Sequence, residues 1–468
     1  MNPAADKTDT VSNESDLAQR LSFKEKVAYG LGGGAEIIMA NSILILAMPV
    51  YYLGLGVRAE VLGLILLGTK IFDAVTDTLV GHLSDNSRLR WGRRKPYILL
   101  GGLITGLSCI PLWRPVQMST AGYMWHFFFI SILYYVFYTI FYVPYNALGY
   151  EMTRDYDERT RLMTYKWGIG SVMGSGILPL LLPLCYAIDP NNAAVGARFW
   201  GPMVGGLIVL LCIAPSIVPR ERIVHQEKIP FFKALAATLQ NKPFLLLCGI
   251  VVLALVGIIG MLQMRLFLNM AYVYPMNQKV SADMIKWFDY LYGAVSALGM
   301  FGAGFLAVRF DKKKVLAAGL LTVAVGMAAS WFYITPRYPY LQLLLGLLTA
   351  PGMSCVWVLT NSCIADVCDY DELATGMRRE GLYGAVFSFS MKLGSAFGLG
   401  LSGFVLWLVG FDKELTAQTY ETVIRFRLAF AMIPTIFFAA ALALAWKYPI
   451  NKQSLLEVQR RLAARKKR

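Results

Sequence analysis

Residues Gly68 to Pro96 read GTKIFDAVTDTLVGHLSDNSRLRWGRRKP, an apolar helical segment that is followed at once by a basic loop. The apolar part starts near residue 59, so the segment 59–84 exceeds the roughly 20 residues that a helix needs to cross a bilayer. Lys70, Asp73 and Asp77 follow an i, i+3, i+7 spacing and therefore share one face. This stretch predicts a membrane-spanning helix with a charged face.

The composition of the whole chain agrees with a membrane protein. Of its 468 residues, 57% are hydrophobic and 16% are charged, and the mean hydropathy is +0.53, whereas soluble domains carry about 25% charged residues. Twelve apolar stretches are long enough to span a bilayer. The predicted spans are 28–53, 59–84, 96–114, 121–150, 160–187, 197–218, 244–273, 283–308, 313–334, 339–366, 380–410 and 422–447.

The basic residues gather in alternate loops, as the positive-inside rule requires of cytoplasmic loops. On one side they are Arg88, Arg90, Arg93, Arg94, Lys95, Arg154, Arg159, Arg161, Lys312, Lys313, Lys314, Arg378 and Arg379, whereas the opposite loops hold one or two each. Both termini are therefore expected in the cytoplasm. Because the net charge of +15 is spread over loops, it does not indicate a nucleic-acid partner.

A polar stretch at 220–243, with the amphipathic segment FFKALAATLQ, separates six predicted spans from six more. The loops GHLSDNSRLRWGRRKP and GFLAVRFDKKKV occupy corresponding places in the two halves, which indicates a weak internal repeat. The predicted organisation is a cytoplasmic tail at 1–27, an N-terminal six-helix bundle at 28–218, a linker at 219–243, a C-terminal six-helix bundle at 244–447 and a basic cytoplasmic tail at 448–468.

The charged face of the second span requires an explanation. Asp73 precedes Ser84 by eleven residues, or roughly 16 Å, which places it near the bilayer midplane, where an ion costs at least about 2.5 kcal/mol. One interpretation is a buried ion pair between Lys70 and one aspartate. The other is a cation site, because two carboxylates one turn apart can ligate Na⁺ or Li⁺ or share a proton.

Several motifs point to a known family. The two repeated loops resemble the signature of the major facilitator superfamily, and KIFDAVTD resembles the second-helix motif of its glycoside–pentoside–hexuronide:cation symporters. Further stretches similar to this family are YVPYNALGYEMTRDYDERTRL (142–162), NKPF (241–244), ADVCDYDELATGMRREG (365–381) and MKLGSAFG (391–398). The resemblance therefore extends over nearly the whole chain.

The resemblance implies an all-α major facilitator fold of twelve transmembrane helices in two pseudo-symmetric six-helix bundles. It also implies symport of a cation, Na⁺ or H⁺, with a sugar, glycoside or uronide, by alternating access. The protein would be a monomer in the cell inner (plasma) membrane, with no cofactor. A Na⁺-coupled transporter of lysophospholipids or other amphiphiles, from a related branch of the superfamily, is the alternative.

By the same resemblance, the cation site comprises Asp73, Thr76, Asp77 and Thr139, and Lys392 faces it from the C-terminal bundle. Thr76 stands where the best-known family member has an asparagine, which still leaves an oxygen ligand. The implied cytoplasmic gate pairs Arg154, Arg159 and Arg161 with Asp366, Asp369 and Glu372. The alternative for these charges is a solvated surface, where each pair contributes under about 1 kcal/mol.

The sugar ligands of the family are not retained, so the substrate site is expected among other polar groups. The candidates are Glu36, Lys70, Tyr142, Asn146, Lys166, Trp167 and Arg265. Glu36 is interpreted as a substrate contact, a proton site or a helix-end charge. Lys166 would pair with Glu36 or meet an anionic substrate, and Arg265 is a second cation at membrane depth. Tyr142 and Asn146 either point into a cavity or pack in the core.

An enzyme is not expected, because the three histidines are scattered and no nucleophile–base or metal cluster is present in the sequence. The seven cysteines fall mostly in apolar runs without a CxxC pair. We therefore expect them to be small buried packing residues rather than disulfides or metal ligands.

Overall fold

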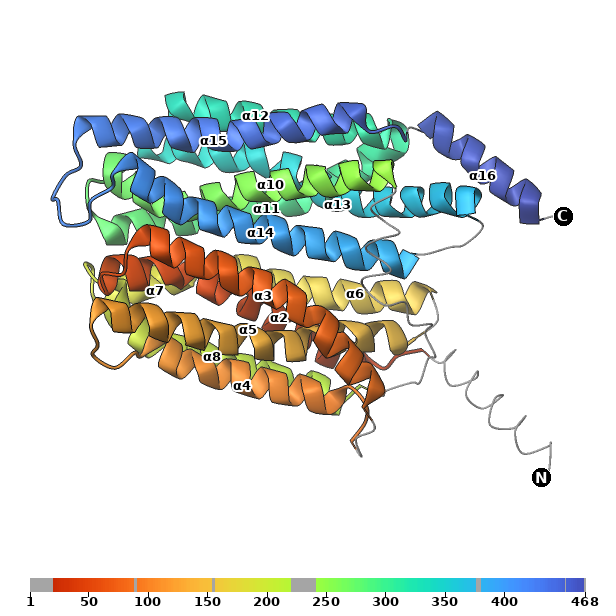
Figure 1. Ribbon diagram of the computed structural model, residues 1–468, viewed down its shortest axis with the longest axis horizontal. Helices are drawn as coiled ribbons and strands as arrows, with labels where there is room; N and C mark the ends of the chain where they lie inside the picture. The colour runs from red at the N-terminus through yellow and green to blue at the C-terminus, as the bar shows by residue number, and fades with distance from the viewer. Residues whose placement is uncertain are drawn as a thin grey trace. The chain divides into compact units, whose positions relative to one another are not determined.

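The computed structural model describes residues 20–87, 91–153, 156–219, 241–375, 380–450 and 452–466. Within these residues the chain is built from helices and contains no strand (Figure 1). These residues pack as two compact units: unit 1 contains those up to residue 57 and those from 72 to 219, and unit 2 contains those from 58 to 71 and those from 241 onward. The expected all-α fold is thus confirmed. The amphipathic segment predicted at 231–240 lies outside the described residues.

Unit 1 contains most of the N-terminal helices. In chain order these are α2 (Phe23–Ala47), η1 (Met48–Gly54), α3 (Ala59–Asn86), α4 (Lys95–Trp113), α5 (Thr120–Glu151), α6 (Tyr156–Ser171), η2 (Val172–Ile177), α7 (Leu178–Ile188) and α8 (Ala193–Ile217). The first residues of α3, up to residue 71, belong to unit 2. Helix α4 packs against α5 and α8, and α2 packs against α6 and α8.

Unit 2 repeats this order of packing. Its helices are α10 (Lys242–Leu268), η3 (Asn269–Val273), α11 (Gln278–Arg309), α12 (Lys312–Tyr333), η4 (Pro339–Gln342), α13 (Leu343–Thr375), α14 (Glu380–Val409), α15 (Tyr420–Lys447) and α16 (Lys452–Lys466). Helix α12 packs against α13 and α15, and α10 packs against α14 and α15. Because the helices at corresponding places make the same pairs in both units, the two bundles are pseudo-symmetric, as expected.

Glycines allow the closest helix contacts in each unit. A Cβ atom on Gly106 of α4 would lie 2.5 Å from the carbonyl oxygen of Gly205 on α8, and one on Gly352 of α13 would lie 2.4 Å from that of Gly319 on α12. Side chains at these positions would push the backbones apart. Close backbone approach through small residues is typical of helix packing inside membranes, where lipid removes most of the hydrophobic drive for association.

Polar caps decide where several helices begin. Helix α2 starts at Phe23, five residues before the predicted span at 28, because Ser22 and Glu25 form a capping box. The Ser22 side chain accepts from the Glu25 backbone N–H, and the Glu25 carboxylate accepts from that of Ser22. Hydropathy alone marks only the apolar part of a helix. This polar first turn extends α2 beyond the stretch that hydropathy predicts.

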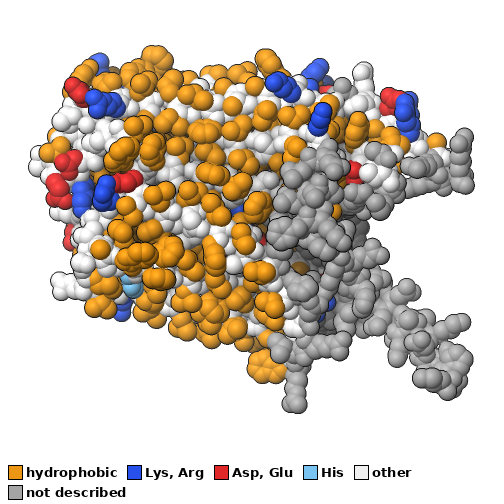
Figure 2. Space-filling model, viewed as in Figure 1, with side chains coloured by type: hydrophobic (Ala, Val, Ile, Leu, Met, Phe, Trp, Pro, Cys, Tyr) orange, Lys and Arg blue, Asp and Glu red, His pale blue; other side chains and the backbone are white. Residues whose placement is uncertain are grey.

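Eleven helices in the described chain are long and apolar enough to cross a membrane. The one predicted span that is not among these eleven is the second, 59–84; it coincides with α3, which has 28 residues but carries Lys70, Asp73 and Asp77 within its apolar stretch. Figure 2 shows hydrophobic side chains over the helix faces and most charged ones toward the ends. Large apolar side chains are exposed, such as Phe301 at 80% and Phe332 at 81%. Such a surface suits lipid rather than water.

Candidate functional site

The predicted cation ligands of unit 1 come together where α3 meets α5. Asp73 is fully buried, and the Thr139 hydroxyl of α5 donates to Asp73 Oδ1 over 2.7 Å. Thr76 donates to the Asp73 backbone carbonyl at 3.0 Å, and its Oγ1 lies 3.5 Å from Thr139 Oγ1. A hydroxyl that donates to a carboxylate favours its ionised form, because charge-assisted hydrogen bonds are about twice as strong as neutral ones.

The side chains of this cluster offer only oxygen atoms as cation ligands. Asp77 lies one turn after Asp73 on α3 and is half-buried. Carboxylate and hydroxyl oxygens are hard ligands, which suit alkali cations or a proton rather than soft metals. Among the residues that the structure describes, no group of three His, Cys, Asp or Glu side chains could hold a metal ion. The role of the four residues as cation ligands stays a prediction.

A second polar cluster of unit 1 joins α2, α5 and α6. Lys166 Nζ lies 2.9 Å from Glu36 Oε2 and donates to Asn146 Oδ1 over 2.6 Å. Both charged side chains are nearly buried, at 7% exposed for Lys166 and 11% for Glu36. The sequence left two possible partners for Lys166, namely Glu36 or an anionic substrate. In the structure, Lys166 pairs with Glu36. The ammonium group also lies 5.2 Å from the centre of the Trp167 ring, which is itself exposed.

Glycines of α2 make room for this ion pair. A Cβ atom on Gly33 would lie 2.7 Å from both the Cγ and the carbonyl oxygen of Lys166, and one on Gly32 would lie 2.4 Å from the Tyr145 ring. The glycine run of α2 therefore lets α5 and α6 approach its backbone, as the small residues around Glu36 predict. The Lys166 side chain can then lie against α2 at Gly33 and reach Glu36, about one turn further along the same helix.

Tyr138 of α5 is a functional candidate that the sequence reasoning missed. Its ring stacks on that of Tyr142, with centroids 5.5 Å apart, and it lies within electrostatic range of Glu36, Asp73 and Asp77. Tyr138 thus lies near the carboxylates of both clusters. The signal was available, because Tyr138 precedes Tyr142 by one helical turn and is adjacent to Thr139.

In unit 2, Arg265 of α10 forms an ion pair with Asp289 of α11, with Arg265 Nη2 2.7 Å from Asp289 Oδ1. The sequence interpretation did not include Asp289. The available signal was a carboxylate that lies beyond the polar first turns of α11, beside its long apolar stretch. Lys392 is half-buried on α14, and Lys70 lies in the part of α3 that belongs to unit 2. The expectation that Lys392 faces Asp73 and Asp77 concerns residues of different units, and it stays a prediction.

Two of the described gate residues, Asp366 and Arg161, form ion pairs inside their own units. Lys312 Nζ donates to both carboxylate oxygens of Asp366 at 2.8 Å, and Arg161 pairs with Glu158 at 3.0 Å. Asp369 and Glu372 follow Asp366 along α13, whereas Arg154 and the side chain of Arg159 lie outside the described residues. The gate between the bundles stays a prediction.

Two further carboxylates anchor charged segments of unit 1. Glu151, at the end of α5, accepts from Arg93 and from Arg94, the latter over 2.6 Å. Glu158 accepts from Lys26 at 2.8 Å and from the Leu21 backbone N–H at 3.2 Å. The hydrogen bond from Lys26 is the main cause that lowers the pKa of Glu158, while burial acts in the opposite direction.

The seven cysteines are all buried free thiols, as expected. Buried free cysteines pack like small apolar side chains. The sequence interpretation of these residues as packing elements is confirmed.

Two repeated six-helix bundles with buried carboxylates define a secondary transporter of the major facilitator type. A family model described as MFS/sugar transport protein matches residues 28–452, and the chain belongs to this family. The family resemblance seen in the sequence is thereby confirmed, as is the prediction that the protein is a transporter and not an enzyme. The apolar helices and the family together identify a multi-pass protein of the inner membrane.

Individual relatives are similar over nearly their full lengths. A putative glycoside/cation symporter, YagG of Escherichia coli, is 25% identical, with 95% of both chains covered. A glucuronide carrier protein homolog of Escherichia coli is also 25% identical, with 96% of this chain and 98% of the relative covered. The crystal structure of a D-xylose-proton symporter superposes with a TM-score of 0.62 at 14% identity, covering 91% of this chain and 97% of the other. That structure supports the fold.

Proposed function

We propose that this protein is a cation-coupled symporter that carries a sugar or glycoside with Na⁺ or H⁺ bound at Asp73 and Asp77. The observation that carries the proposal is the fully buried Asp73 carboxylate, which accepts the Thr139 hydroxyl at 2.7 Å in a member of a sugar transport family. Thr76 and Thr139 would complete the oxygen ligands of Na⁺. With H⁺, the two carboxylates would share one proton.

The buried pair of carboxylates would explain why sugar transport is coupled to a cation. Two like charges one turn apart in an apolar helix repel each other and are poorly solvated, so a bound cation removes most of that cost. A conformational change that closes the site to one side of the membrane and opens it to the other is then cheaper with the cation bound. Alternating access of the two six-helix bundles is the corresponding transport cycle of this fold.

The cargo is inferred from the relatives and from the polar cluster around Lys166. Relatives named as a glycoside/cation symporter and a glucuronide carrier homolog support a sugar-type cargo. Glu36, Tyr142, Asn146 and Lys166 are the proposed contacts in unit 1. Because Lys166 is ion-paired with Glu36, its charge is balanced without an anionic substrate. The lysophospholipid alternative has no support among these relatives.

The test is gradient-driven uptake by the purified protein in proteoliposomes, with the sugar found by a thermal-shift screen of neutral sugars, glycosides, uronides and sulfonated sugars. A Na⁺ gradient and a pH gradient are imposed separately, which identifies the coupling ion. We expect Asp73→Asn and Asp77→Asn to abolish accumulation above equilibrium. The exposed Asp412→Asn is the matched control and should accumulate like the wild type. Undiminished accumulation by both site variants would reject the proposal.

A further inference from the structure

Trp167 is a large aromatic residue that unit 1 leaves open beside its buried ion pair. It is 57% exposed on α6, and the Lys166 ammonium lies 5.2 Å from the centre of its ring. The same ammonium lies 2.9 Å from Glu36 Oε2 and donates to Asn146 Oδ1 over 2.6 Å. The indole ring therefore adjoins the cluster that holds the proposed sugar contacts.

The surface around Trp167 is small and polar. Thr164 lies one turn before it, Ser171 lies one turn after it, Gly168 follows it directly, and all three are exposed. Exposed positions of α8 carry large apolar side chains instead, namely Met203, Leu210 and Ile217. Within a membrane, small and polar residues are typical of helix contacts and of surfaces that line a water-filled cavity. The neighbours of Trp167 thus favour a cavity or a helix contact over lipid.

Open space adjoins the ring at Gly168. A Cβ atom on this glycine would have no atom of the described chain within 4 Å. Close packing within the described chain therefore does not require a glycine here, although glycine weakens a helix relative to alanine. The missing side chain leaves room for a ligand beside the indole.

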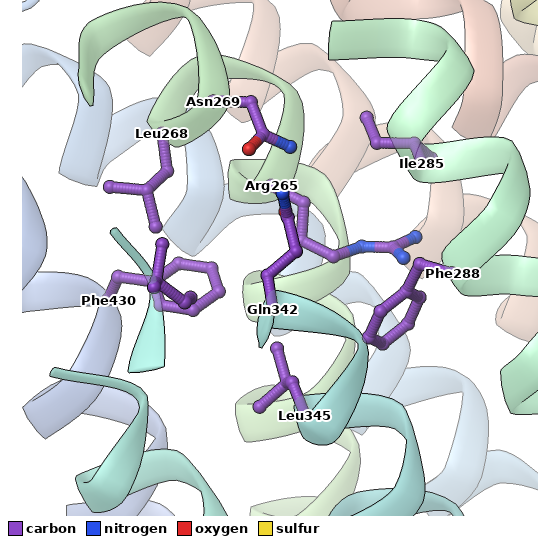
Figure 3. A pocket seen from close by; sticks show the side chains of 9 residues that line it. Arg265, Leu268, Asn269, Ile285, Phe288, Gln342, Leu345 and Phe430 are labelled. Atoms are coloured by element: carbon purple, nitrogen blue, oxygen red, sulfur yellow. The ribbon is translucent and has the colours of Figure 1, made fainter. Parts of the chain in front are cut away.

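A pocket of unit 2, beside Arg265 and Phe288, offers much less room (Figure 3). It leaves about 10 Å³ for the centre of a water molecule, which is enough for one oxygen atom. A sugar ring does not fit into that space. The open side of Trp167 sets no such limit.

The chemistry of the occupant follows from the indole. The face of an aromatic ring is negative, so it attracts the C–H groups on the face of a sugar ring, and flat contact removes apolar surface of both from water. The sugar hydroxyls then point outward from the ring edge, where polar side chains such as Asn146 can bind them. We propose that Trp167 is an aromatic platform on which the pyranose ring of the cargo stacks. This proposal rests on the proposed function and names a pyranoside as its cargo.

Binding measurements on the purified full-length protein test the platform. The probes are methyl β-D-glucopyranoside, methyl β-D-galactopyranoside, methyl β-D-xylopyranoside and methyl β-D-glucuronide, titrated by calorimetry in Na⁺ buffer. We expect Trp167→Leu to raise the Kd of every probe that binds the wild type by about tenfold. Trp167→Phe keeps an aromatic face and should raise it by about threefold at most. Wild-type affinity in Trp167→Leu, or an equal loss in both variants, would overturn the platform.

Trp446 near the end of α15 supplies the matched control, because it is a 70% exposed tryptophan of the other unit. Trp446→Leu should bind the probes like the wild type. An equal loss of affinity in Trp446→Leu and Trp167→Leu would overturn the platform, since the effect would not be local. If Trp167 serves a helix contact instead, Trp167→Leu will lower the midpoint of thermal unfolding and keep the wild-type Kd, which would also overturn the platform.

Tryptophan fluorescence reports on the ring itself. A sugar that stacks on the indole changes its emission, so the change that a bound probe causes in the wild type should be lost in Trp167→Phe at saturating sugar. It should persist in Trp446→Phe. A change of wild-type size in Trp167→Phe would overturn the platform. If none of the four probes binds the wild type, the platform is wrong, whereas gradient-driven uptake of another sugar would still uphold the proposed function.

Discussion

Lys166 and Glu36 are buried charges of unit 1 that compensate each other. Each is nearly excluded from solvent, and Lys166 also donates to Asn146. Removing one partner of a buried ion pair costs more stability than replacing both partners by neutral groups, because the remaining charge is left in a poorly solvated place. The stability of this region should therefore respond to charge balance rather than to either residue alone.

The single variants Lys166→Met and Glu36→Gln should each lower the free energy of unfolding by about 3–5 kcal/mol. The double variant should lose much less than the sum of the two, because no unpaired charge remains. Thermal unfolding of the three variants and the wild type, in one detergent without sugar, measures the difference. A double variant that is as unstable as the sum would show that the charges do not compensate each other.

At the scale of helices, α2 and α6 touch through backbone atoms. The approach depends on Gly33, where a Cβ atom would lie 2.7 Å from the Lys166 carbonyl oxygen. Backbone cannot move aside as a flexible side chain can. The glycine run that the sequence offers beside Glu36 is thus a condition for the ion pair as well as for the packing.

Gly33→Ala should lower the midpoint of thermal unfolding, although alanine is the better helix former by about 1 kcal/mol. The added methyl group would separate α2 from α6 and lengthen the contact between Lys166 and Glu36. Gly206→Ala on α8 is the matched control, because no atom lies within 4 Å of its Cβ position. We expect this control to be as stable as the wild type or more so. Equal midpoints for the two variants would contradict the packing argument.

The start of α6 is tied to the start of α2 by Glu158, which accepts from Lys26 and from the Leu21 backbone. Folding lowers the pKa of Glu158 from its ordinary value of 4.5, mainly through Lys26, with Arg161 as a further contributor. The ionised carboxylate therefore stabilises the fold above pH 4.5. This contribution is lost as the pH falls through the lowered pKa.

The stability difference between the wild type and Glu158→Gln should consequently be largest near neutral pH and decrease below pH 4.5. Unfolding midpoints of both proteins between pH 7 and the most acidic pH that keeps them soluble measure it. The exposed Glu421→Gln serves as control, since its carboxylate is 77% exposed and pairs only with Arg425. A difference that grows on acidification would contradict the assignment.

For the whole molecule, hydropathy predicted the helices, and the polar stretch at 220–243 together with the repeated loops and the family resemblance predicted the two bundles. These signals are local, and each needs only a continuous stretch of chain. Contacts between distant helices were harder to foresee. The sequence left two partners open for Lys166, and it missed Asp289 as the partner of Arg265, because neither pair is close in sequence. The start of α2 was missed because its capping box is polar.

Coupling between cation binding and sugar binding is a property of the whole molecule. Thermodynamic linkage fixes how each affinity depends on the other ligand. If the cation raises the affinity for the sugar by a given factor, the sugar must raise the affinity for the cation by the same factor, typically about 5–150-fold. Calorimetric titrations of sugar at zero and saturating Na⁺, and of Na⁺ with and without sugar, measure the two factors independently. A pH series replaces Na⁺ if protons drive uptake.

Asp77→Asn should make the two sugar titrations coincide, at the affinity that the wild type shows without the cation. The amide keeps the size of the side chain but removes one charge, so cation binding is lost while the Glu36–Lys166 pair is left intact. If Asp77→Asn instead bound sugar with the affinity of the cation-loaded wild type, the coupling between cation and sugar would also be lost. The driving cation would then have to bind at a different site. Because both factors refer to one equilibrium, two equal factors well above one would show that cation and sugar do not bind independently.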